Sequence, residues 1–311
     1  MDFKKNIENF NQQFLFKPVI VNKPQKKYKK FIVNGMGGSH LAADLFKLWQ
    51  NKIDLIIEKN YNLPLLPDIK NRLVILSSYS GNTAEIIYCF DFCKKNHLPV
   101  FIISSGGKLL TLAKKYKLPY IQLLSGFQPR QATGLMFTAL TQIIIPQHFS
   151  EVKSLSQLQP KNFEEKGKNI AKFIKGLIPI IYSSEINLPL AYYWKINFNE
   201  TSKVPAFYNI LPEANHNELN SFNLKTDYKK FGFIFLQDSN DSKFINKRFD
   251  VLTQLYKSFK IISIKLGQNS QLTAIFNNVI LSQWSSYYLA QLLRHNPDKV
   301  ELIEKFKKLL H

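Results

Sequence analysis

The stretch Ser78-Tyr79-Ser80-Gly81-Asn82-Thr83 lies directly behind the apolar run Leu73-Val74-Ile75-Leu76 and decides how this part of the chain folds. An apolar run of this length, bounded by small polar residues, predicts a buried parallel strand. From Asn82 to Asn96, apolar side chains recur at helical spacing, which predicts a helix. The unit is therefore a strand, a polar turn and a helix.

The same turn contains the groups that bind anions. Three hydroxyls and a glycine stand at the start of a helix whose first N–H groups have no partner within it. With the positive end of the helix dipole, they favour an anion, most often a phosphate. The turn has no Lys, which a nucleotide-binding P-loop would require, so we expect a monophosphate held by Ser78, Ser80 and Thr83. The alternative is a helix cap rich in Ser and Thr that binds nothing.

A second turn of the same kind occurs earlier in the chain. The apolar Phe31-Ile32-Val33 leads into Gly35-Met36-Gly37-Gly38-Ser39, and a helical pattern follows from Leu41 to Trp49. The spacing is not the dinucleotide-binding fingerprint, because His40 stands where the third glycine would fall. Both turns should lie at the carboxyl end of one sheet, where open α/β sheets bind ligands. We therefore expect one ligand held from two sides, with Gly37, Gly38 and Ser39 on the second side.

Composition indicates a globular chain long enough for two domains. The chain has 311 residues, of which 45% are hydrophobic and 21% are charged. Its 42 Lys and Arg against 22 Asp and Glu give a formal net charge of +20, which could indicate a nucleic-acid or membrane partner. The lysines are scattered in twos and threes without a long basic run. We therefore expect neither partner.

The two cysteines favour a reducing compartment. Cys89 and Cys93 are four residues apart on one predicted helix, which is poor geometry for a disulfide, and the chain has no other Cys. Met1–Phe10 carries charges and no apolar core, unlike a signal peptide. The longest uncharged run, Gln131–Phe149, is broken by polar residues and Pro and predicts a buried helix rather than a membrane span. We expect a soluble, cytoplasmic protein.

Strand and helix patterns alternate along both halves of the chain. The first half has strand patterns at Lys30–Asn34, Leu55–Glu58, Leu73–Ser77, Val100–Ile103 and Tyr120–Leu123, and helical patterns at 39–50, 82–96, 107–116 and 132–145. The second half has strand patterns at Ile178–Tyr182, Ala206–Ile210, Phe231–Leu236 and Ile261–Lys265, and helical patterns at 188–203, 241–258, 281–294 and 300–310. This alternation predicts parallel sheets covered by helices on both faces.

The expected organisation is two similar α/β domains, residues 1–150 and 151–311. Residues 1–27 are polar and should form a helix and an arm packed on the outside. Ser150–Lys168 is rich in Ser, Gln, Lys, Pro and Glu, which is typical of a connection between domains.

The second half contains two candidates for proton transfer. Glu200 stands near the end of the helical pattern 188–203, beside large apolar residues, where a carboxylate can serve as a general base. His216 stands between two Asn in a turn started by Pro212, a poor place for a core histidine and a good one for proton transfer. The alternative for Glu200 is a surface residue on an amphipathic helix. No metal-ligand spacing and no nucleophile elbow is present.

A set of motifs in one order carries a resemblance to a known family. The motifs are Gly35–Ser39, Ser78–Thr83, Pro129-Arg130, Asn199-Glu200 with Lys203, Pro212–Glu218, Trp284-Ser285 with Tyr287–Ala290, and Ile303 with Phe306-Lys307. This order resembles the bifunctional phosphoglucose/phosphomannose isomerase family, a branch of the sugar isomerase (SIS) fold. The chain departs from the family at His40, where a small residue is usual, and at Gln131-Ala132-Thr133 after Arg130.

The resemblance implies an α/β fold of two SIS-type units and a reaction through a cis-enediol that needs no metal or organic cofactor. It implies that the two turns hold the substrate phosphate and that Glu200 moves a proton between C1 and C2. His216 would assist ring opening with Lys307 as its counterpart, and Arg130 would stabilise the enediolate charge. Lys307 also lies in the Lys-rich stretch Lys305–Lys308, so its alternative is a solvated surface lysine. A homodimer is implied, because in the family the His loop can complete the neighbouring subunit's site.

Two other functions use the same fold. A phosphosugar-binding regulator would normally carry an output domain, and the first 30 residues are too few and too polar to supply one. A glucosamine-6-phosphate type isomerase or deaminating synthase is the other alternative, and the glutamine-hydrolysing domain of such synthases is absent from this sequence. The isomerase of glucose 6-phosphate, and of mannose 6-phosphate, is therefore the favoured hypothesis.

Overall fold

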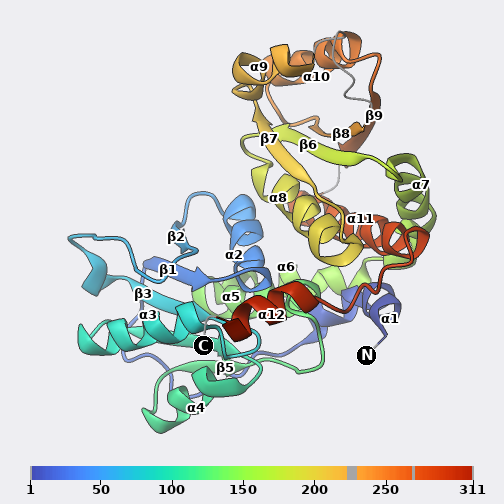
Figure 1. Ribbon diagram of the computed structural model, residues 1–311. Helices are drawn as coiled ribbons and strands as arrows, with labels where there is room; N and C mark the ends of the chain where they lie inside the picture. Colours follow the sequence, from blue (N-terminus) through green and yellow to red (C-terminus); the bar gives the residue numbers. More distant parts are fainter. Residues whose placement is uncertain (1, 223–229, 268–269, 310–311) are drawn as a thin grey trace. The chain divides into compact units, whose positions relative to one another are not determined.

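The computed structural model describes residues 2–222, 230–267 and 270–309 (Figure 1). By its internal contacts the chain divides into two compact units. The first unit is Glu8–Leu158, and the second runs from Gln159 onward and includes Asp2–Ile7. The sequence suggested a division at residue 150, but the division falls after Leu158. Short helices continue the first unit beyond residue 150.

A five-stranded parallel sheet forms the centre of the first unit. Its strands are β1 (Lys30–Gly35), β2 (Asp54–Glu58), β3 (Leu73–Ser77), β4 (Val100–Ser104) and β5 (Tyr120–Gln122), in the order β2-β1-β3-β4-β5. Gly35 of β1 pairs with Ser77 of β3. These two strands therefore end at the same level, which brings the turns that follow them to one edge of the sheet.

The helices of the first unit cover both faces of this sheet. They are α2 (Gly38–Trp49), α3 (Ala84–Lys95), α4 (Gly107–Lys115), α5 (Thr133–Ile144) and α6 (Phe149–Ser154), with 3-10 turns η1 (Phe10–Leu15), η2 (Ile69–Asn71), η3 (Pro129–Gln131), η4 (Pro146–His148) and η5 (Leu155–Gln157). Strands β3 and β4 are buried along their whole length, as the continuous apolar runs predict. The predicted helix in 131–149 is α5, which is buried over most of its length.

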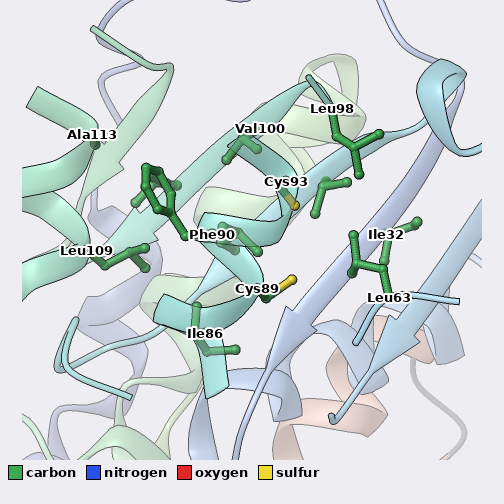
Figure 2. Packing of buried hydrophobic residues seen from close by; sticks show 13 residues of the cluster. Ile32, Leu63, Ile86, Cys89, Phe90, Cys93, Leu98, Val100, Leu109 and Ala113 are labelled. Carbon is green, nitrogen blue, oxygen red and sulfur yellow. The ribbon is translucent and has the colours of Figure 1, made fainter. Parts of the chain in front are cut away.

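Figure 2 shows the core on the α3 side, where Cys89 and Cys93 point into a cluster with Ile32, Leu63 and Phe90. Both cysteines are free and buried. The hydrogen bond that it shares with Cys89, together with burial, raises the pKa of the Cys93 thiol. Because both side chains are buried in this apolar cluster, the pair serves as small apolar side chains of the core.

A four-stranded parallel sheet forms the centre of the second unit. Its strands are β6 (Ile178–Ser184), β7 (Phe207–Leu211), β8 (Phe231–Asp238) and β9 (Lys260–Leu266), in the order β7-β6-β8-β9. The helices are α1 (Phe3–Glu8), α7 (Glu164–Ile174), α8 (Leu188–Asn197), α9 (Ala214–Asn217), α10 (Lys243–Leu255), α11 (Gln271–Leu292) and α12 (Glu301–Leu309), with 3-10 turns η6 (Pro160–Phe163) and η8 (Leu219–Phe222). A π-helical segment, Phe198–Ser202, continues α8.

The two faces of this second sheet carry different helices. Helices α8 and α11 lie on one face, and α9 and α10 lie on the other (Figure 1). Tyr182 of β6 packs with Phe249 and Leu252 of α10, because alternate residues of a strand point to opposite faces. The expected fold class, α/β with two parallel sheets flanked by helices, is confirmed.

Two local predictions differ from the structure. The start of the segment 1–27 is helical and residues 17–27 form a largely exposed arm, but the helical part does not lie on the outside, because Phe3 and Ile7 are buried in the second unit and Phe10 and Phe14 in the first. The division after Leu158 falls within the predicted connection 150–168, which is built largely of short helical pieces, namely η5, η6 and parts of α6 and α7. Helix α11 begins at Gln271 rather than 281, since its polar first turns are capped by Ser270, whose hydroxyl accepts from the Thr273 N–H. The last residue of the predicted helix 300–310 lies outside the described residues.

None of the helices in the described ranges combines the length and the apolar character that a bilayer span requires.

Candidate active site

The two predicted turns are joined by hydrogen bonds at the carboxyl edge of the first sheet. The Tyr79 N–H donates to Ser39 Oγ at 3.0 Å, and Ser77 Oγ donates to the Ser39 carbonyl at 2.9 Å. Because Ser39 Oγ accepts from a backbone N–H, its own O–H is available to donate to a ligand. The register of β1 and β3 thus builds one polar patch from residues far apart in sequence.

The glycines of the first turn serve different purposes. Gly37 precedes α2 with a φ of +53°, a left-handed conformation that favours glycine. A side chain on Gly38 would place its Cβ only 2.5 Å from the Arg130 nitrogen. Glycine is therefore required at 38 so that the Pro129–Arg130 backbone can lie directly against the start of α2.

The second turn keeps its hydroxyls at the start of α3. Ser78 Oγ lies 2.9 Å from Thr83 Oγ1 and accepts a hydrogen bond of 3.1 Å from the Gly81 N–H. Thr83 is the N-cap residue of α3, yet its side chain makes no capping hydrogen bond to the helix. The Ile86 N–H donates to the Thr83 carbonyl at 3.1 Å, so within the described residues the N–H groups of Ala84 and Glu85 are the ones left for another acceptor. Ser80 is exposed at the tip of the turn.

A third turn, Ser104–Gly107, packs against the second one. The sequence analysis did not predict it as part of the site. The Leu109 N–H donates to the Gly81 carbonyl at 2.8 Å, and the Lys108 N–H donates to Asn82 Oδ1 at 2.9 Å. A Cβ on Gly81, whose φ is +71°, would lie 1.8 Å from the Gly106 oxygen. The Gly106-Gly107 pair after the apolar β4 is the sequence signal that could have revealed this turn.

Tyr79 connects the turns to the loop that leads to Arg130. Its hydroxyl donates to the Leu124 carbonyl at 2.8 Å and accepts from the Phe127 N–H at 3.0 Å. Burial raises the pKa of the Tyr79 phenol, so it remains a neutral donor. Arg130 itself lies in η3 and is only 1% exposed. The first unit therefore brings together seven of the predicted site residues: Gly37, Gly38, Ser39, Ser78, Ser80, Thr83 and Arg130.

The residue that departs from the family pattern beside these turns, His40, is buried. Its Nδ1 lies 2.6 Å from the Asp44 carboxylate within α2, and Lys59 Nζ lies 3.1 Å from the same carboxylate. The imidazole thus contacts the carboxylate of Asp44, which also forms an ion pair with Lys59. Its bulk is accommodated inside the first unit.

In the second unit, Glu200 lies in the π-helical segment that follows α8. The predicted α-helix 188–203 therefore changes its geometry at the candidate base, and π-helical insertions are frequent at functional sites. The segment is fixed to its surroundings: Ser202 Oγ donates to the Ser286 carbonyl of α11 at 2.8 Å, and His295 Nδ1 lies 2.6 Å from the Ser202 carbonyl. Lys203, with a left-handed φ of +59°, ends it and donates from Nζ to the Glu200 carbonyl. Glu200 is half-buried.

His216 is exposed on the four-residue helix α9. It lines a groove of about 450 Å³ formed with α10, whose lining residues are Asn215, His216, Leu219, Phe244, Lys247, Arg248, Val251, Leu252 and Leu255. Arg248 donates to Asn215 Oδ1 at 3.2 Å, which holds the neighbour of His216 in place. His216 is therefore presented outward from the face of the second sheet that carries α9 and α10.

Glu200 and His216 lie at opposite ends of β7 and on opposite faces of the second sheet. Glu200 precedes β7 and is tied to α11, whereas His216 follows β7 and lies against α10. A strand of five residues spans about 16 Å. Within the described residues, no hydrogen bond or ion pair joins Glu200, His216 or Lys307 to one another. The second unit does not bring these three together.

Lys307 lies on α12, where every described residue is exposed. Four apolar side chains of this helix, Leu302, Ile303, Phe306 and Leu309, are also open to solvent. Among the described residues, no three side chains of the His, Cys, Asp and Glu types gather as metal ligands would.

Comparison with known proteins places these features in a family. Residues 163–310 match the model of the bacterial phospho-glucose isomerase C-terminal SIS domain. A bifunctional phosphoglucose/phosphomannose isomerase of Aquifex aeolicus is 31% identical over 98% of this chain and 97% of its own length. One from Thermoplasma volcanium is 33% identical over 91% of each chain. The C-terminal domain of glucosamine-fructose-6-phosphate aminotransferase from Francisella tularensis superimposes with a TM-score of 0.71 over 96% of each chain at 14% identity, which shows the shared fold. This chain belongs to the bifunctional phosphoglucose/phosphomannose isomerase family.

Proposed function

We propose that this protein interconverts glucose 6-phosphate, and mannose 6-phosphate, with fructose 6-phosphate through a cis-enediol. The observation that carries the proposal is the polar patch of the first unit, where the Ser39 and Ser78–Thr83 turns are bonded to one another at the starts of two helices. Such a patch suits a phosphate monoester. Family membership supports the reaction.

The proposed roles follow from the chemistry of each group. Ser39, Ser78, Ser80 and Thr83, with the Gly37-Gly38 backbone, hold the phosphate. Glu200 removes the proton from C2 of the open-chain aldose and delivers it to C1, so its carboxylate is restored at the end of the cycle. Arg130 stabilises the negative charge of the enediolate, a charge that exists only between the two proton transfers. His216 and Lys307 move protons at the ring oxygen and the anomeric hydroxyl when the ring opens.

The proposed division of labour follows the predicted domains. The unit Glu8–Leu158 supplies the phosphate-binding turns, and the unit from Gln159 onward supplies the groups that move protons. The proposed compartment is the cytoplasm, which the free buried thiols of Cys89 and Cys93 support, since an oxidising compartment would favour disulfides.

A homodimer is part of the proposal because of the positions of Glu200 and His216. They lie on opposite faces of one sheet and at opposite ends of β7, so one sugar cannot meet both within a single copy of the second unit. His216 therefore acts on the sugar bound to the partner subunit. The exposed position of α9 supports this role.

The first experiment is a coupled assay for fructose 6-phosphate with glucose 6-phosphate and mannose 6-phosphate in parallel, with EDTA present. Turnover of both sugars is the expected result. Turnover of glucose 6-phosphate alone would retain the mechanism and narrow the substrate range. Binding of both sugars without turnover would refute the isomerase and favour the phosphosugar-binding regulator, and activity on glucosamine 6-phosphate alone would favour the amino-sugar alternative.

Mixed dimers test the exchange of His216. Glu200→Gln and His216→Ala chains should each be nearly inactive, and refolding them together should restore activity, because one site of each mixed dimer then contains both native residues. Refolded mixtures that stay at the level of the single variants would show that His216 acts within its own chain or not at all.

A further inference from the structure

The amide of Gln13 lies deep inside the first unit, although it comes from the N-terminal segment. Gln13 is 3% exposed and belongs to η1, between the buried Phe10 and Phe14. Removing an amide from water is costly unless its donor and acceptor both find partners. The partners of this side chain therefore indicate what it does.

Both ends of the amide are used next to Arg130. Gln13 Nε2 donates to the Gln131 carbonyl at 2.8 Å, and Gln13 Oε1 accepts from the Leu135 N–H at 3.1 Å. The first acceptor is the residue after Arg130, and the donor is in the first turn of α5, where helical N–H groups lack partners within the helix. One side chain thus ties together η3 and the start of α5.

The neighbouring sequence leaves space for this side chain. A Cβ on Gly134 would lie 2.9 Å from the Cβ and 3.0 Å from Oε1 of Gln13. On its other side the Arg130 turn lies against Gly38, where a Cβ would lie 2.5 Å from the Arg130 nitrogen. The turn is therefore held between the start of α2 and the Gln13 amide.

We propose that Gln13 is a positioning residue for Arg130: it fixes the backbone of η3 so that the guanidinium meets the charge that develops on the sugar. This assignment rests on the proposed function. The alternative is a merely structural role, in which Gln13 anchors the N-terminal segment. Loss of such an anchor would lower the stability of the protein but would weaken the binding of all ligands equally. Misplacing a catalytic group by about 1 Å can lower a rate roughly a hundred-fold, so a small shift of η3 is measurable.

The test compares Gln13→Glu with the control Asn11→Ala. Glutamate keeps the size of the side chain and can accept from Leu135, but in its ionised form it cannot donate to the Gln131 carbonyl, so the variant is measured at pH 8 as well as at pH 6. Asn11 lies in the same segment and donates to the Ser156 carbonyl at 2.8 Å, away from the Arg130 turn. Both variants lose a hydrogen bond to a backbone carbonyl, so both report on anchoring of the segment.

The readouts are kcat, KM and the affinity for two analogues. Arabinonate 5-phosphate carries a carboxylate that imitates the enediolate charge, whereas arabitol 5-phosphate has the same phosphate without that charge. In Gln13→Glu we expect kcat and the arabinonate affinity to fall together, by about ten- to a hundred-fold, with KM and the arabitol affinity within about two-fold of the wild type. Asn11→Ala should leave all four within about two-fold.

A second variant acts without touching Gln13. Gly134→Ala adds a methyl group that displaces the Gln13 side chain, and it should reproduce the Gln13→Glu pattern even if Gln13→Glu folds poorly. Equal weakening of both analogues, or a change in melting temperature alone, would overturn the positioning role. If the wild type is active and kcat is unchanged in Gln13→Glu and Gly134→Ala, the role of Gln13 is refuted but the proposed function stands. If the wild type shows no turnover, the proposed function is refuted together with the role of Gln13.

Discussion

In the first unit β3 leads through Ser78–Thr83 into α3, and at the equivalent place in the second unit β8 leads through 239–242 into α10. Each of these strands lies next to the first strand of its sheet, so the two turns occupy the same position in two similar folds. Their polar groups differ. The first turn supplies hydroxyls and a glycine, whereas the second unit has carboxylates at Asp238 and Asp241.

The two helix starts are also completed differently. Ser242 caps α10 by accepting from the Ile245 N–H, whereas the Thr83 hydroxyl pairs with Ser78 and makes no capping hydrogen bond to α3. The Asp238 carboxylate accepts a hydrogen bond from Asn187 Nδ2 at 3.1 Å. Asp241 is buried, with an exposed fraction of 8%. The proposed binding turn therefore leaves the hydroxyl of its N-cap residue uncommitted to the helix, whereas the turn of the second unit uses its N-cap hydroxyl internally and places carboxylates beside it.

The largest effect should come from Glu200→Gln, which separates chemistry in the second unit from phosphate binding in the first. The amide cannot accept a proton, so kcat should fall by about a hundred- to ten-thousand-fold while the Kd for the phosphosugar stays within about two-fold. A coupled assay and calorimetry measure the two quantities. Glu185→Gln, at an exposed glutamate of the same unit, is the control. Retained turnover in Glu200→Gln would contradict the assignment of the base.

Gly81→Ala should be the most damaging substitution in the proposed binding turn Ser78–Thr83. Its Cβ would lie 1.8 Å from the Gly106 oxygen, and its φ of +71° disfavours any side chain. We expect a loss of roughly 3 kcal/mol in the free energy of unfolding, together with lost sugar binding. Gly176→Ala is the control, since Gly176 has a φ of +79° and nothing within 4 Å of the added Cβ. It should lose only about 1–2 kcal/mol, and equal losses would mean that the turns do not interlock.

If the two turns differ in this way, Thr83→Ala should weaken sugar binding and Ser242→Ala should lower stability. Thr83→Ala should raise the Kd for the sugar about ten- to a hundred-fold, because hydrogen bonds to charged groups contribute about 1.5–3 kcal/mol, with little change in stability. Ser242→Ala should lose about 1 kcal/mol of stability as a lost helix cap and leave the Kd unchanged. Titration calorimetry and urea unfolding measure the pair. A Ser242→Ala chain with weakened binding would show that the second turn takes part in the site.

The smallest effect concerns the pH dependence of stability at Asp241. Burial, with the nearby Asp238 charge, raises the pKa of Asp241, and its Oδ2 has no hydrogen-bond partner among the described residues. Because the folded pKa is raised, the folded state holds the proton more tightly, so this carboxyl favours folding at low pH and loses that contribution as pH rises through the folded pKa.

Asp241→Asn should therefore raise the melting temperature at pH 7. The gain should disappear as pH falls below about 4, near the ordinary pKa of an aspartate. Melting curves from pH 3.5 to 7 measure this difference. A constant gain at every pH would point to a cause other than ionisation.

The opposite pH response is expected in the first unit. Hydrogen bonds from Lys30 and then Arg72 lower the pKa of Asp68 to about 2. That contribution is present at neutral pH and is lost only as pH falls from about 4 towards 2. Because Asp68 lies at the surface, solvent screens the interaction and its effect on stability is small.

The order of strands and helices could be predicted from the sequence, because continuous apolar runs and polar turns are local signals. The two turns around Gly37 and Ser80 could also be predicted, since the small and hydroxyl residues that phosphate binding requires are adjacent in the chain. The family could be recognised from the order of such motifs. These features depend on neighbours in sequence, so no tertiary information was needed.

Contacts between residues far apart in the chain could not be predicted in this way, because they depend on how the whole chain packs. Gln13 looked like part of a polar outer arm, and its burial depends on space left by Gly134 and on an unpaired helix start, which no local pattern reveals. Packing across the sheets likewise produces three further features: the contact of the Ser104–Gly107 turn with the Ser78–Thr83 turn, the π-helical turn at Glu200, and the separation of Glu200 from His216. Local patterns fix which groups are present, and burial of the chain's apolar faces fixes which of them meet, because that burial is a property of the whole fold.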